Sequence, residues 1–396
     1  SYLNMEQIIS ATMVSGADAI HPGFGFLSEN ARFAELCEKC GITFVGPPSK
    51  VIRMLGNKQI ARSTMIAAGV PVVPGSEGSV DDIETGLKEA ERIGYPVIIK
   101  AALGGGGKGM RVANTPEEFP EAYATARKES EIAFGDGTMY IEHFVVNPRH
   151  IEFQILADSQ GNVIHLGERD CSIQRNHQKM IEESPSAAVS DELREKMGHA
   201  AVTAAKAAGY VNAGTIEFLL EPDGKFWFME MNTRIQVEHP VTEWVTGIDL
   251  VKEQLKIASG MPLGVTQDNV RIMGHAIECR INAENPKKNF RPSPGKIKGA
   301  HFPGGNGIRV DTCVYNGCKI PPYYDSMLAK LIVHADNRRD AIAKMQSALG
   351  EVIIDGIDTN IDYQYEILKN EDYQSGNFDT GFLASHIIAG VKINEN

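Results

Sequence analysis

The spacing of apolar and polar residues near the start of the chain predicts a small parallel sheet. Between residues 17 and 45, a strand, a helix and a second strand follow one another. This αβαβ rhythm is typical of parallel strands joined by crossover helices. The elements that we expect are a strand over Ala17–Phe26 that ends in a glycine-rich turn, a helix over Asn30–Lys39 and a strand over Ile42–Val45.

From residue 151 onward the pattern changes to apolar residues at every second position, which predicts a mostly antiparallel sheet. The strands expected from this alternation are Ile151–Leu156, Val163–Leu166, Thr215–Leu220 and Phe226–Met231. Helical spacing predicts three longer helices around this sheet. They are Asp191–Ala208, Val241–Ala258 and Arg338–Leu349.

Proline and glycine residues divide the chain into three expected parts. Residues 1–71 hold the αβ segment and a linker helix over Ser49–Ala68, and they open without a methionine in mid-pattern, so we expect an amino-terminal truncation. Residues 72–145 form a small unit around a glycine-rich hairpin, and residues 146–396 hold the antiparallel sheet. In the small unit we expect a helix over Asp82–Ile93, strands over Pro96–Lys100 and Gly109–Val112, and a helix from Thr115.

Composition narrows the class of protein. The chain has 396 residues, 42% of them hydrophobic, so it can bury a large core. Its net charge of -12 argues against a nucleic-acid groove or an anionic membrane surface as partner. With neither a membrane-spanning apolar run nor a secretory leader, we expect a cytoplasmic protein with reduced cysteines. The pair Cys37 and Cys40 is interpreted as helix packing on one face.

The segment around residues 98–112 carries glycines at 104, 106 and 109 in a Gly-x-Gly-x-x-Gly pattern. A dinucleotide site would need a helix directly after the last glycine, but Met110–Val112 has the pattern of a strand. A Walker-type phosphate loop is excluded because Gly109 follows Lys108. The segment therefore predicts a hairpin lid whose backbone N–H groups close on phosphate, with Lys100 adding positive charge. A mobile surface hairpin without a ligand is the alternative.

Two acidic residues on the predicted hairpin of Thr215–Leu220 and Phe226–Asn232 suggest a metal site. A two-residue turn at Asp223–Gly224 would place Glu217 opposite Glu230. Two like charges about 5 Å apart cost about 3 kcal/mol at an effective dielectric of about 20. A magnesium or manganese ion would neutralise them, with Asn232 as a further ligand. The alternative is a protonated or lysine-paired carboxylate couple.

The residues that follow, Arg234 and Glu238, could form with Lys179 a pocket that holds and deprotonates a small oxyanion. The alternative is a solvated helix pair, since an arginine and a glutamate four residues apart meet on a helix surface. Pro240 argues against a helix through them. His150 and His177 suit ribose or phosphate contacts, or they are structural histidines.

These motifs together resemble the biotin carboxylase family of ATP-grasp enzymes, over nearly the whole chain. The segments that carry the resemblance are HPGFGFLSEN (21–30), KAALGGGGKGMR (100–111), NPRHIEFQIL (147–156), ERDCSIQRNHQKMIEESP (168–185), EMNTRIQVEHPVTE (230–243), ECRINAE (278–284) and PPYYDSMLAKL (321–331). The resemblance implies an α/β and α+β chain with the ATP-grasp fold. Its parts would be a remnant of an amino-terminal parallel αβ domain, a small glycine-rich lid domain and a carboxy-terminal antiparallel-sheet domain.

The resemblance also implies a role for each matching residue. Lys58, Lys100, Gly106, Gly107 and His150 would contact the phosphates and ribose of ATP, Glu142, His143, Phe144 and Val145 would line the adenine edge, and Gln174 and His177 would approach the nucleotide. Glu217, Glu230 and Asn232 would ligate magnesium or manganese, and Glu217 and Glu230 would also contact ATP. Lys179, Arg234, Gln236 and Val237 would hold bicarbonate, Glu238 would be its general base, and Arg280 would lie against the ureido oxygen of biotin.

The implied activity is that of an ATP-dependent carbon-nitrogen ligase that carboxylates biotin through carboxyphosphate. Biotin would be carried by a biotin carboxyl carrier protein, with carboxyltransferase subunits as further partners, as in acetyl-CoA carboxylase and fatty-acid synthesis. A pyruvate or acyl-CoA carboxylase, a carbamoyl-phosphate-type ligase and a nucleotide-binding module are the alternatives. Arg234 should lower the pKa of Glu238, whereas a general base should titrate nearer neutrality.

The sequence departs from the family pattern in two places. The first βαβ unit of the family lies before the position of Ser1, so we expect the amino-terminal sheet to lose strands, which affects folding, homodimer formation and activity. Phe24 stands where relatives often carry tyrosine, which would remove a hydroxyl contact near the biotin pocket.

Overall fold

The computed structural model describes residues 2–101, 109–176 and 178–393. The chain forms two compact units. The larger unit contains Ser1–Val70, Arg149–Leu220 and Glu230–Asn396, and the smaller unit contains Pro71–Pro148 and Glu221–Met229. Each unit has its own sheet and its own apolar core.

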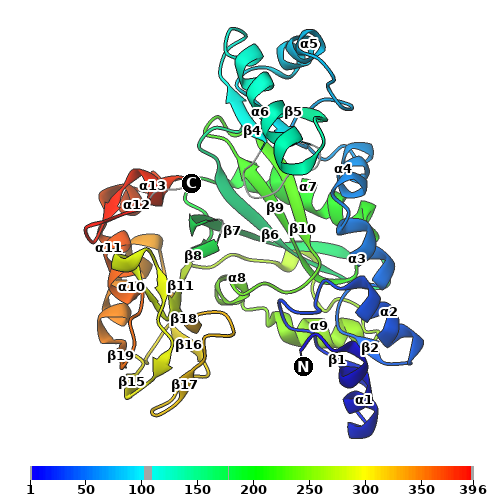
Figure 1. Ribbon diagram of the computed structural model, residues 1–396. Helices are drawn as coiled ribbons and strands as arrows, with labels where there is room; N and C mark the ends of the chain where they lie inside the picture. The colour runs from blue at the N-terminus through cyan, green and yellow to red at the C-terminus, as the bar shows by residue number, and fades with distance from the viewer. Residues whose placement is uncertain (1, 102–108, 177, 394–396) are drawn as a thin grey trace. The chain divides into compact units, whose positions relative to one another are not determined.

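The amino-terminal part of the larger unit has the predicted parallel pairing (Figure 1). Its elements are α1 (Met5–Ser15), β1 (Ala19–Ile20), α2 (Ala31–Lys39), β2 (Thr43–Phe44), α3 (Ser49–Leu55) and α4 (Lys58–Ala67). Strand β1 pairs in parallel with β2. Cys37 is buried in this core, but Cys40 is the exposed carboxy-terminal cap of α2, so the expectation of one shared packing face is wrong.

The single linker helix predicted over Ser49–Ala68 is wrong, because the structure has two helices there. Helix α3 ends before Gly56, and Asn57 caps α4 by accepting hydrogen bonds from the backbone N–H groups of Gln59 and Ile60. An asparagine at this position stabilises the start of a new helix. The spacing of apolar residues continues across the break, so it predicts one helix.

Eight strands of the chain form one large sheet with the order β10-β9-β6-β7-β8-β11-β18-β16. The strands are β6 (Arg149–Ala157), β7 (Val163–Arg175), β8 (Gln178–Ser184), β9 (Asn212–Leu220), β10 (Phe226–Asn232), β11 (His275–Asn282), β16 (Ile308–Thr312) and β18 (Met327–Ala335). The pairings of β6 through β18 are antiparallel, which confirms the expectation from the period-two pattern.

Helices pack against this sheet along its length (Figure 1). They are α7 (Asp191–Ala207), α8 (His239–Thr246), α9 (Leu250–Ala258), α10 (Arg338–Glu351) and α11 (Ile361–Lys369). Helices α10 and α11 pack on Ile277, Cys279 and Leu331, whereas Val241 and Val245 of α8 pack on Ala276 and Ile332. Because side chains alternate along β11, Glu278 and Arg280 lie on the α8 face.

The helix predicted over Val241–Ala258 is also two helices in the structure. Helix α8 ends at Gly247, which has a φ of 71°, a backbone conformation that favours glycine and ends helices.

The remaining elements of the larger unit are short. They are η1 (Gln267–Asn269), β12 (Glu284–Asn285), η2 (Pro286–Lys288), β13 (Arg291–Pro292), β14 (Gly295–Lys296), β15 (Gly299–His301), β17 (Lys319–Ile320), β19 (Ile353–Asp355), α12 (Glu371–Ser375), α13 (Phe382–Ser385), β20 (Ile387–Ile388) and β21 (Val391–Lys392).

The smaller unit is a three-stranded antiparallel sheet with two helices. Its elements are α5 (Ile83–Ile93), β3 (Val97–Ala101), β4 (Met110–Ala113), α6 (Phe119–Phe134) and β5 (Met139–His143). A strand and not a helix follows Gly109, as predicted, so the Gly-x-Gly-x-x-Gly pattern does not open a dinucleotide-binding helix. The helix expected from Thr115 begins only at Phe119.

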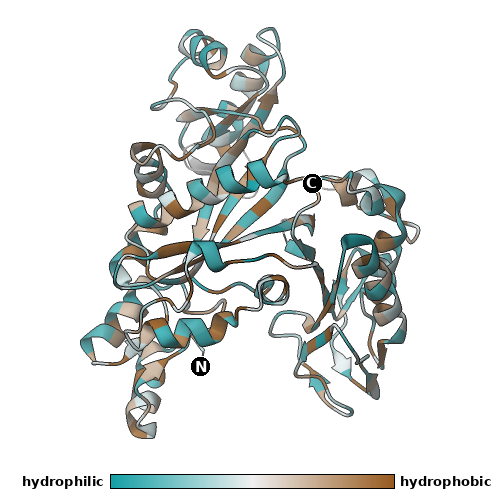
Figure 2. Cartoon of the chain, turned by 180° about the vertical axis from the view of Figure 1, so that it is seen from behind, coloured by the Kyte–Doolittle hydropathy of each residue, from teal (hydrophilic) through white to brown (hydrophobic). Residues whose placement is uncertain are grey.

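Figure 2 shows hydrophilic and hydrophobic residues mixed along the helices of both units. None of the helices in the described part of the chain has the length and apolar character needed to cross a membrane.

Candidate active site

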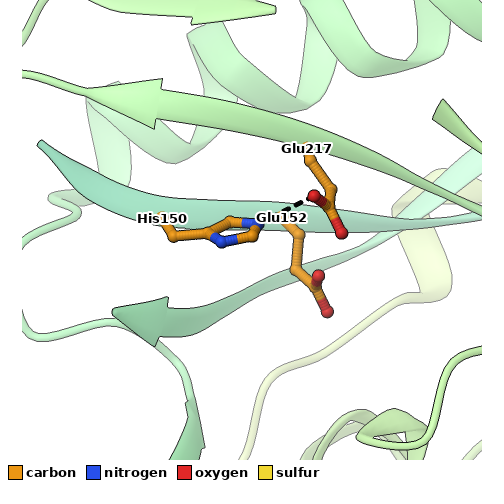
Figure 3. A group of neighbouring side chains, drawn as sticks. All are labelled: His150, Glu152 and Glu217. Atoms are coloured by element: carbon orange, nitrogen blue, oxygen red, sulfur yellow. Dashed lines mark ion pairs between the residues drawn. The ribbon is translucent and has the colours of Figure 1, made fainter. Parts of the chain in front are cut away.

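A row of charged side chains crosses the middle of the large sheet. Glu152 on β6 stands directly opposite Glu217 on β9, and on its other side opposite Arg169 on β7. His150, two residues before Glu152 on the same strand, points to the same face, as Figure 3 shows. Neighbouring carboxylates of like charge destabilise a strand pair, so this row needs positive charge close to it.

Lys179 on β8 supplies part of that charge. Its Nζ atom lies 2.5 Å from Glu152 Oε2, 2.9 Å from Glu217 Oε1 and 2.7 Å from Glu238 Oε1. Burial lowers the pKa of Lys179, but the surrounding carboxylates outweigh it and hold that pKa well above its ordinary value. Burial also opposes ionisation of Glu217, yet Lys179 and His150 hold its pKa well below the ordinary value. Both groups are therefore charged at neutral pH.

Arg169 supplies the remaining positive charge next to these carboxylates, although its side chain is fully buried. Its Nε pairs with Glu152, and its two Nη atoms donate to four neutral side chains. These acceptors are Gln154 at 2.8 Å, Thr242 at 2.9 Å, Thr215 at 3.1 Å and Gln236 at 3.2 Å. A buried guanidinium is tolerated only when its donors are satisfied in this way.

Glu217 is the acceptor for several polar groups. Its Oε1 accepts hydrogen bonds from Asn232 Nδ2 at 2.8 Å and Gln236 Nε2 at 2.9 Å. His150 Nε2 lies 2.9 Å from Glu217 Oε2, although the ring is not aligned for a straight hydrogen bond. Burial lowers the pKa of His150, but the Glu217 charge outweighs it, so the net shift is upward. The structure thus brings Asn232 and His150 to Glu217.

The hairpin turn that was predicted at Asp223–Gly224 is one residue longer. Glu221 N–H donates to the carbonyl of Lys225 at 2.8 Å, and Gly224 N–H donates to the carbonyl of Glu221 at 3.0 Å. This three-residue loop ends in Gly224 with a φ of 85°, the conformation of a turn followed by a bulge. At the turn, Glu221 and not Pro222 therefore faces Lys225.

Glu230 nevertheless lies near Glu217. Burial and then the charge of Glu217 raise the pKa of Glu230, while the positive charge of Lys58, the first residue of α4, lowers it. Met229 and Glu230 both keep part of their surface open to solvent although protein surrounds the Glu230 carboxylate, and this breaks the regular alternation of β10. Within the described residues no group donates a hydrogen bond to the Glu230 carboxylate. Carboxylate oxygens without a donor, beside a second carboxylate, are a donor set that fits a hard divalent cation.

Glu238 is buried between two cations. Its Oε1 faces Lys179, and its Oε2 accepts a hydrogen bond from Arg280 Nη2 at 2.8 Å. Burial raises the pKa of Glu238, but Lys179, Arg280 and Arg169 together bring it below the ordinary value. Pairing with cations thus outweighs burial.

Arg234 lies next to Asn232 and is paired with Glu29. Its Nε donates to Glu29 Oε2 at 2.9 Å, and its Nη2 donates to Asn232 Oδ1 at 3.0 Å. The expectation that Arg234 lowers the pKa of Glu238 is therefore corrected: Lys179, Arg280 and Arg169 do so. Arg234 and Glu238 lie in the loop before α8, with Pro240 in its first turn, so they form no helix pair. In the same loop the carbonyl of Val237 accepts a hydrogen bond from Lys330 Nζ at 2.8 Å.

The other predicted residues are distributed as follows. In the smaller unit Lys100 forms an ion pair with Glu142. His143 Nε2 lies 3.5 Å from Glu221 Oε2. The N–H group of Phe144 donates a hydrogen bond to the Pro96 carbonyl at 2.8 Å. Val145 follows β5 in the same unit. In the larger unit Gln174 is buried and pairs in register with Lys179, and Phe24 lies exposed after β1. Gly106, Gly107 and His177 lie outside the described residues.

Six residues of this region were missed by the sequence analysis. They are Glu29, Glu152, Arg169, Glu182, Glu278 and Lys330. Each lies inside a motif that carries the family resemblance. For all of them except Glu29, which lies in an exposed turn, a charged residue in an otherwise apolar strand is a signal that could have found them, because burying an unpaired charge is unfavourable.

Comparison with known proteins agrees with this architecture. Residues 1–52 match the family model of the biotin carboxylase N-terminal domain, residues 57–266 that of the carbamoyl-phosphate synthase L chain ATP-binding domain, and residues 278–385 that of the biotin carboxylase C-terminal domain. Biotin carboxylase 1 of Bacillus subtilis is 56% identical over 98% of this chain and 87% of its own length. A pyruvate carboxylase subunit of Methanothermobacter thermautotrophicus is 53% identical over 97% of this chain and 78% of its own length.

A solved structure is similar over the same range. The biotin carboxylase domain dimer of the Hydrogenobacter thermophilus 2-oxoglutarate carboxylase, in complex with MgADP, ADP and bicarbonate, is 51% identical. The match has a TM-score of 0.86 and covers 97% of this chain and 85% of that chain. The motifs, the large antiparallel sheet and these similarities together show that the chain belongs to the biotin carboxylase family of ATP-dependent ligases.

Proposed function

We propose that the buried cluster around Lys179 is where this chain activates bicarbonate for the ATP-dependent carboxylation of biotin. The overall reaction follows from the family. The observation that supports the location is the convergence of Glu152, Glu217 and Glu238 on one lysine Nζ. Such a cluster offers an anion-binding cation beside a carboxylate that can accept a proton.

In this proposal Lys179, Arg234, Gln236 and the backbone of Val237 hold bicarbonate, and Glu238 takes its proton. The freed oxygen bonds to the γ-phosphorus of ATP while the bond from that phosphorus to the bridging oxygen breaks, which releases ADP. The carboxyphosphate formed splits into CO₂ and phosphate. The phosphate takes the proton of the ureido nitrogen of biotin, and that nitrogen bonds to CO₂.

The lowered pKa of Glu238 does not prevent this role. The cations that stabilise the Glu238 carboxylate also stabilise carbonate when bicarbonate binds beside them. The driving force for proton transfer depends on the difference between the pKa of Glu238 and the pKa of bicarbonate. Because the same cations lower both pKa values, their difference changes less than either value alone.

Arg280 is proposed to stabilise the biotin ureido oxygen as it gains negative charge. Its Nε donates to Glu182 Oε1 at 2.6 Å and its Nη2 to Glu238 Oε2 at 2.8 Å. Among the described residues none accepts a hydrogen bond from its Nη1 atom, which leaves this donor for a substrate oxygen. An arginine stays protonated throughout the pH range of enzymes, so it can serve an enolate-like anion.

The nucleotide and metal assignments belong to the same proposal. Glu217, Glu230 and Asn232 would hold Mg²⁺, or Mn²⁺, which also prefers oxygen ligands. The metal, when bound, neutralises charge on the triphosphate. Lys58, Lys100, Gly106, Gly107, His150, Gln174 and His177 would contact ATP, and Glu142 to Val145 its adenine edge. Residues 1–71, 72–145 and 146–396 would act as the amino-terminal, lid and catalytic parts.

The final carboxyl acceptor belongs to the proposal as well. We assign the first half-reaction of acetyl-CoA carboxylase in the cytoplasm, with biotin on a carrier protein, a carboxyltransferase as next enzyme and a homodimer as the assembly. The 56% identity to Biotin carboxylase 1 of Bacillus subtilis supports the biotin carboxylation step of this assignment. A pyruvate or 2-oxo-acid carboxylase is the second candidate, because relatives of both kinds are more than 50% identical.

Phosphate release from Mg-ATP with bicarbonate, measured with and without free biotin, tests the proposed function. We expect bicarbonate to be required and biotin to stimulate the rate and accumulate as carboxybiotin. Nucleotide binding by calorimetry without turnover would instead indicate a nucleotide-binding module. Turnover that depends on ammonia and ignores biotin would indicate a carbamoyl-phosphate-type ligase.

A further inference from the structure

Two buried glutamates stand side by side next to Arg280. Glu182 on β8 is directly opposite Glu278 on β11, and both side chains have 0% exposure. Directly opposite residues of antiparallel strands have Cβ atoms about 4.5–5.5 Å apart. Two ionised carboxylates at this separation, with no water around them, would repel each other strongly.

Hydrogen bonding in this pair is incomplete. Glu182 Oε1 accepts from Arg280 Nε at 2.6 Å, but Glu182 Oε2 and both oxygens of Glu278 have no hydrogen-bond donor among the described residues. A buried carboxylate without donors is far more unfavourable than a buried carboxylic acid. A proton on this pair removes one charge and supplies the missing donor.

The charged groups around the pair come from every strand and loop packed against it. Arg280 on β11, Lys179 on β8, Lys330 on β18 and Glu238 before α8 all act on it. Burial raises the pKa of Glu182 to about 7, against the lowering effect of Arg280 and Lys179. Burial holds the pKa of Glu278 well above its ordinary value, against Lys330 and with a further upward contribution from Glu182.

We propose that Glu182 and Glu278 share one proton and that the pair is a positioning device for Arg280. Ionised Glu182 holds the Nε edge of the guanidinium, and protonated Glu278 keeps a second negative charge away from it. The assignment of a task to Arg280 rests on the proposed function. The shared proton does not, because it follows from the geometry of the two carboxylates.

The pair also determines where the guanidinium of Arg280 points. Arg280 binds Glu182 on one side and Glu238 on the other. If Glu182 were neutral, Glu238 would become the sole carboxylate acceptor of Arg280. The guanidinium would then turn toward Glu238 and away from a substrate oxygen.

Two matched substitutions test the positioning role. Glu182→Gln should lower kcat/KM for biotin by about 10- to 100-fold, the usual effect of misplacing a catalytic group, while bicarbonate-dependent ATP cleavage without biotin changes less than threefold. Glu278→Gln mimics the protonated acid and should keep kcat/KM for biotin within threefold. The matched control is Glu168→Gln, since Glu168 is a fully buried glutamate that pairs with Arg194 at 2.7 Å. It should leave the ratio of the two reactions unchanged.

The pH profile gives a readout that a structural role would not move. Glu182 should gain its proton as pH falls through about 7, so kcat/KM for biotin should fall there in the wild type and in Glu278→Gln. This acid limb should be absent in Glu182→Gln. A Glu182→Gln variant that loses both reactions equally, or that keeps the acid limb, would overturn the positioning role.

Infrared spectroscopy tests the shared proton without any turnover. At pH 8 the wild type should show the C=O band of a buried protonated carboxyl group, and Glu278→Gln should lose it. Absence of that band from the wild type would overturn the shared proton. If the wild type does not carboxylate biotin but shows the band, the proposed function fails while the proton-sharing pair stands.

Discussion

Glu238→Gln should reduce bicarbonate-dependent ATP cleavage by about 100- to 10,000-fold, the usual contribution of a general base. Glutamine keeps the shape of the side chain but cannot accept the proton of bicarbonate. Lys179 and Arg280 lose one carboxylate partner in this variant, so bicarbonate should bind at least as well as in the wild type. The measurement is initial phosphate release over a range of bicarbonate concentrations.

Two controls make the result specific. Binding of Mg-ATP, measured by calorimetry, should change less than twofold in Glu238→Gln. Glu253→Gln replaces a glutamate that is also buried and pairs with a single lysine, Lys256, at 2.6 Å. It should keep near wild-type activity. Wild-type turnover in Glu238→Gln at saturating bicarbonate would exclude Glu238 as the base.

Among the proposed substitutions, Lys179→Met should destabilise the folded chain most. Methionine fills similar space but leaves Glu152, Glu217 and Glu238 without the cation on which they converge. Removing one partner from a buried ion pair destabilises a protein by about 3–5 kcal/mol. We therefore expect a clearly lower denaturation midpoint in urea, together with loss of ATP cleavage. Lys196→Met, at an exposed position of α7, is the matched control and should leave the midpoint unchanged.

The loss of stability should depend on pH. In the wild type the pKa values of Glu217 and Glu238 are lowered from 4.5, so their contribution is present above that pH and is lost only in stronger acid. Without Lys179 their pKa values should rise, and the folded chain should then lose stability as pH increases. The difference between variant and wild type should grow from pH 5 to pH 8. A constant difference would show that packing, and not charge, explains the effect.

Local patterns in the sequence predicted strands β3, β4, β6, β7, β9 and β10, but they did not lead us to β5, β8, β11, β16 and β18. The alternation of Ile277, Glu278, Cys279 and Arg280 is a strand signal that we missed. Breaks inside helical patterns were missed, as at Gly56, because apolar spacing continues across them. The turn at Pro222 was misjudged because Asp223–Gly224 fits both a two-residue and a three-residue loop.

The pairing of charges could not be inferred from spacing. Arg234 binds Glu29, which lies 205 positions earlier in the chain, and not Glu238, which lies four residues later. Lys179 meets Glu152 and Glu217 through strand order β9-β6-β7-β8, which no local pattern encodes. Identifying which cation serves which carboxylate therefore required the fold.

Oxygen transfer from labelled bicarbonate tests the central mechanism most directly. If bicarbonate is deprotonated at this cluster and attacks ATP, each phosphate released in the presence of biotin should carry one ¹⁸O atom from ¹⁸O-bicarbonate. Mass spectrometry of the phosphate measures this label. Phosphate without label, with carboxybiotin still formed, would contradict the account, because ATP would then be cleaved by water rather than by bicarbonate.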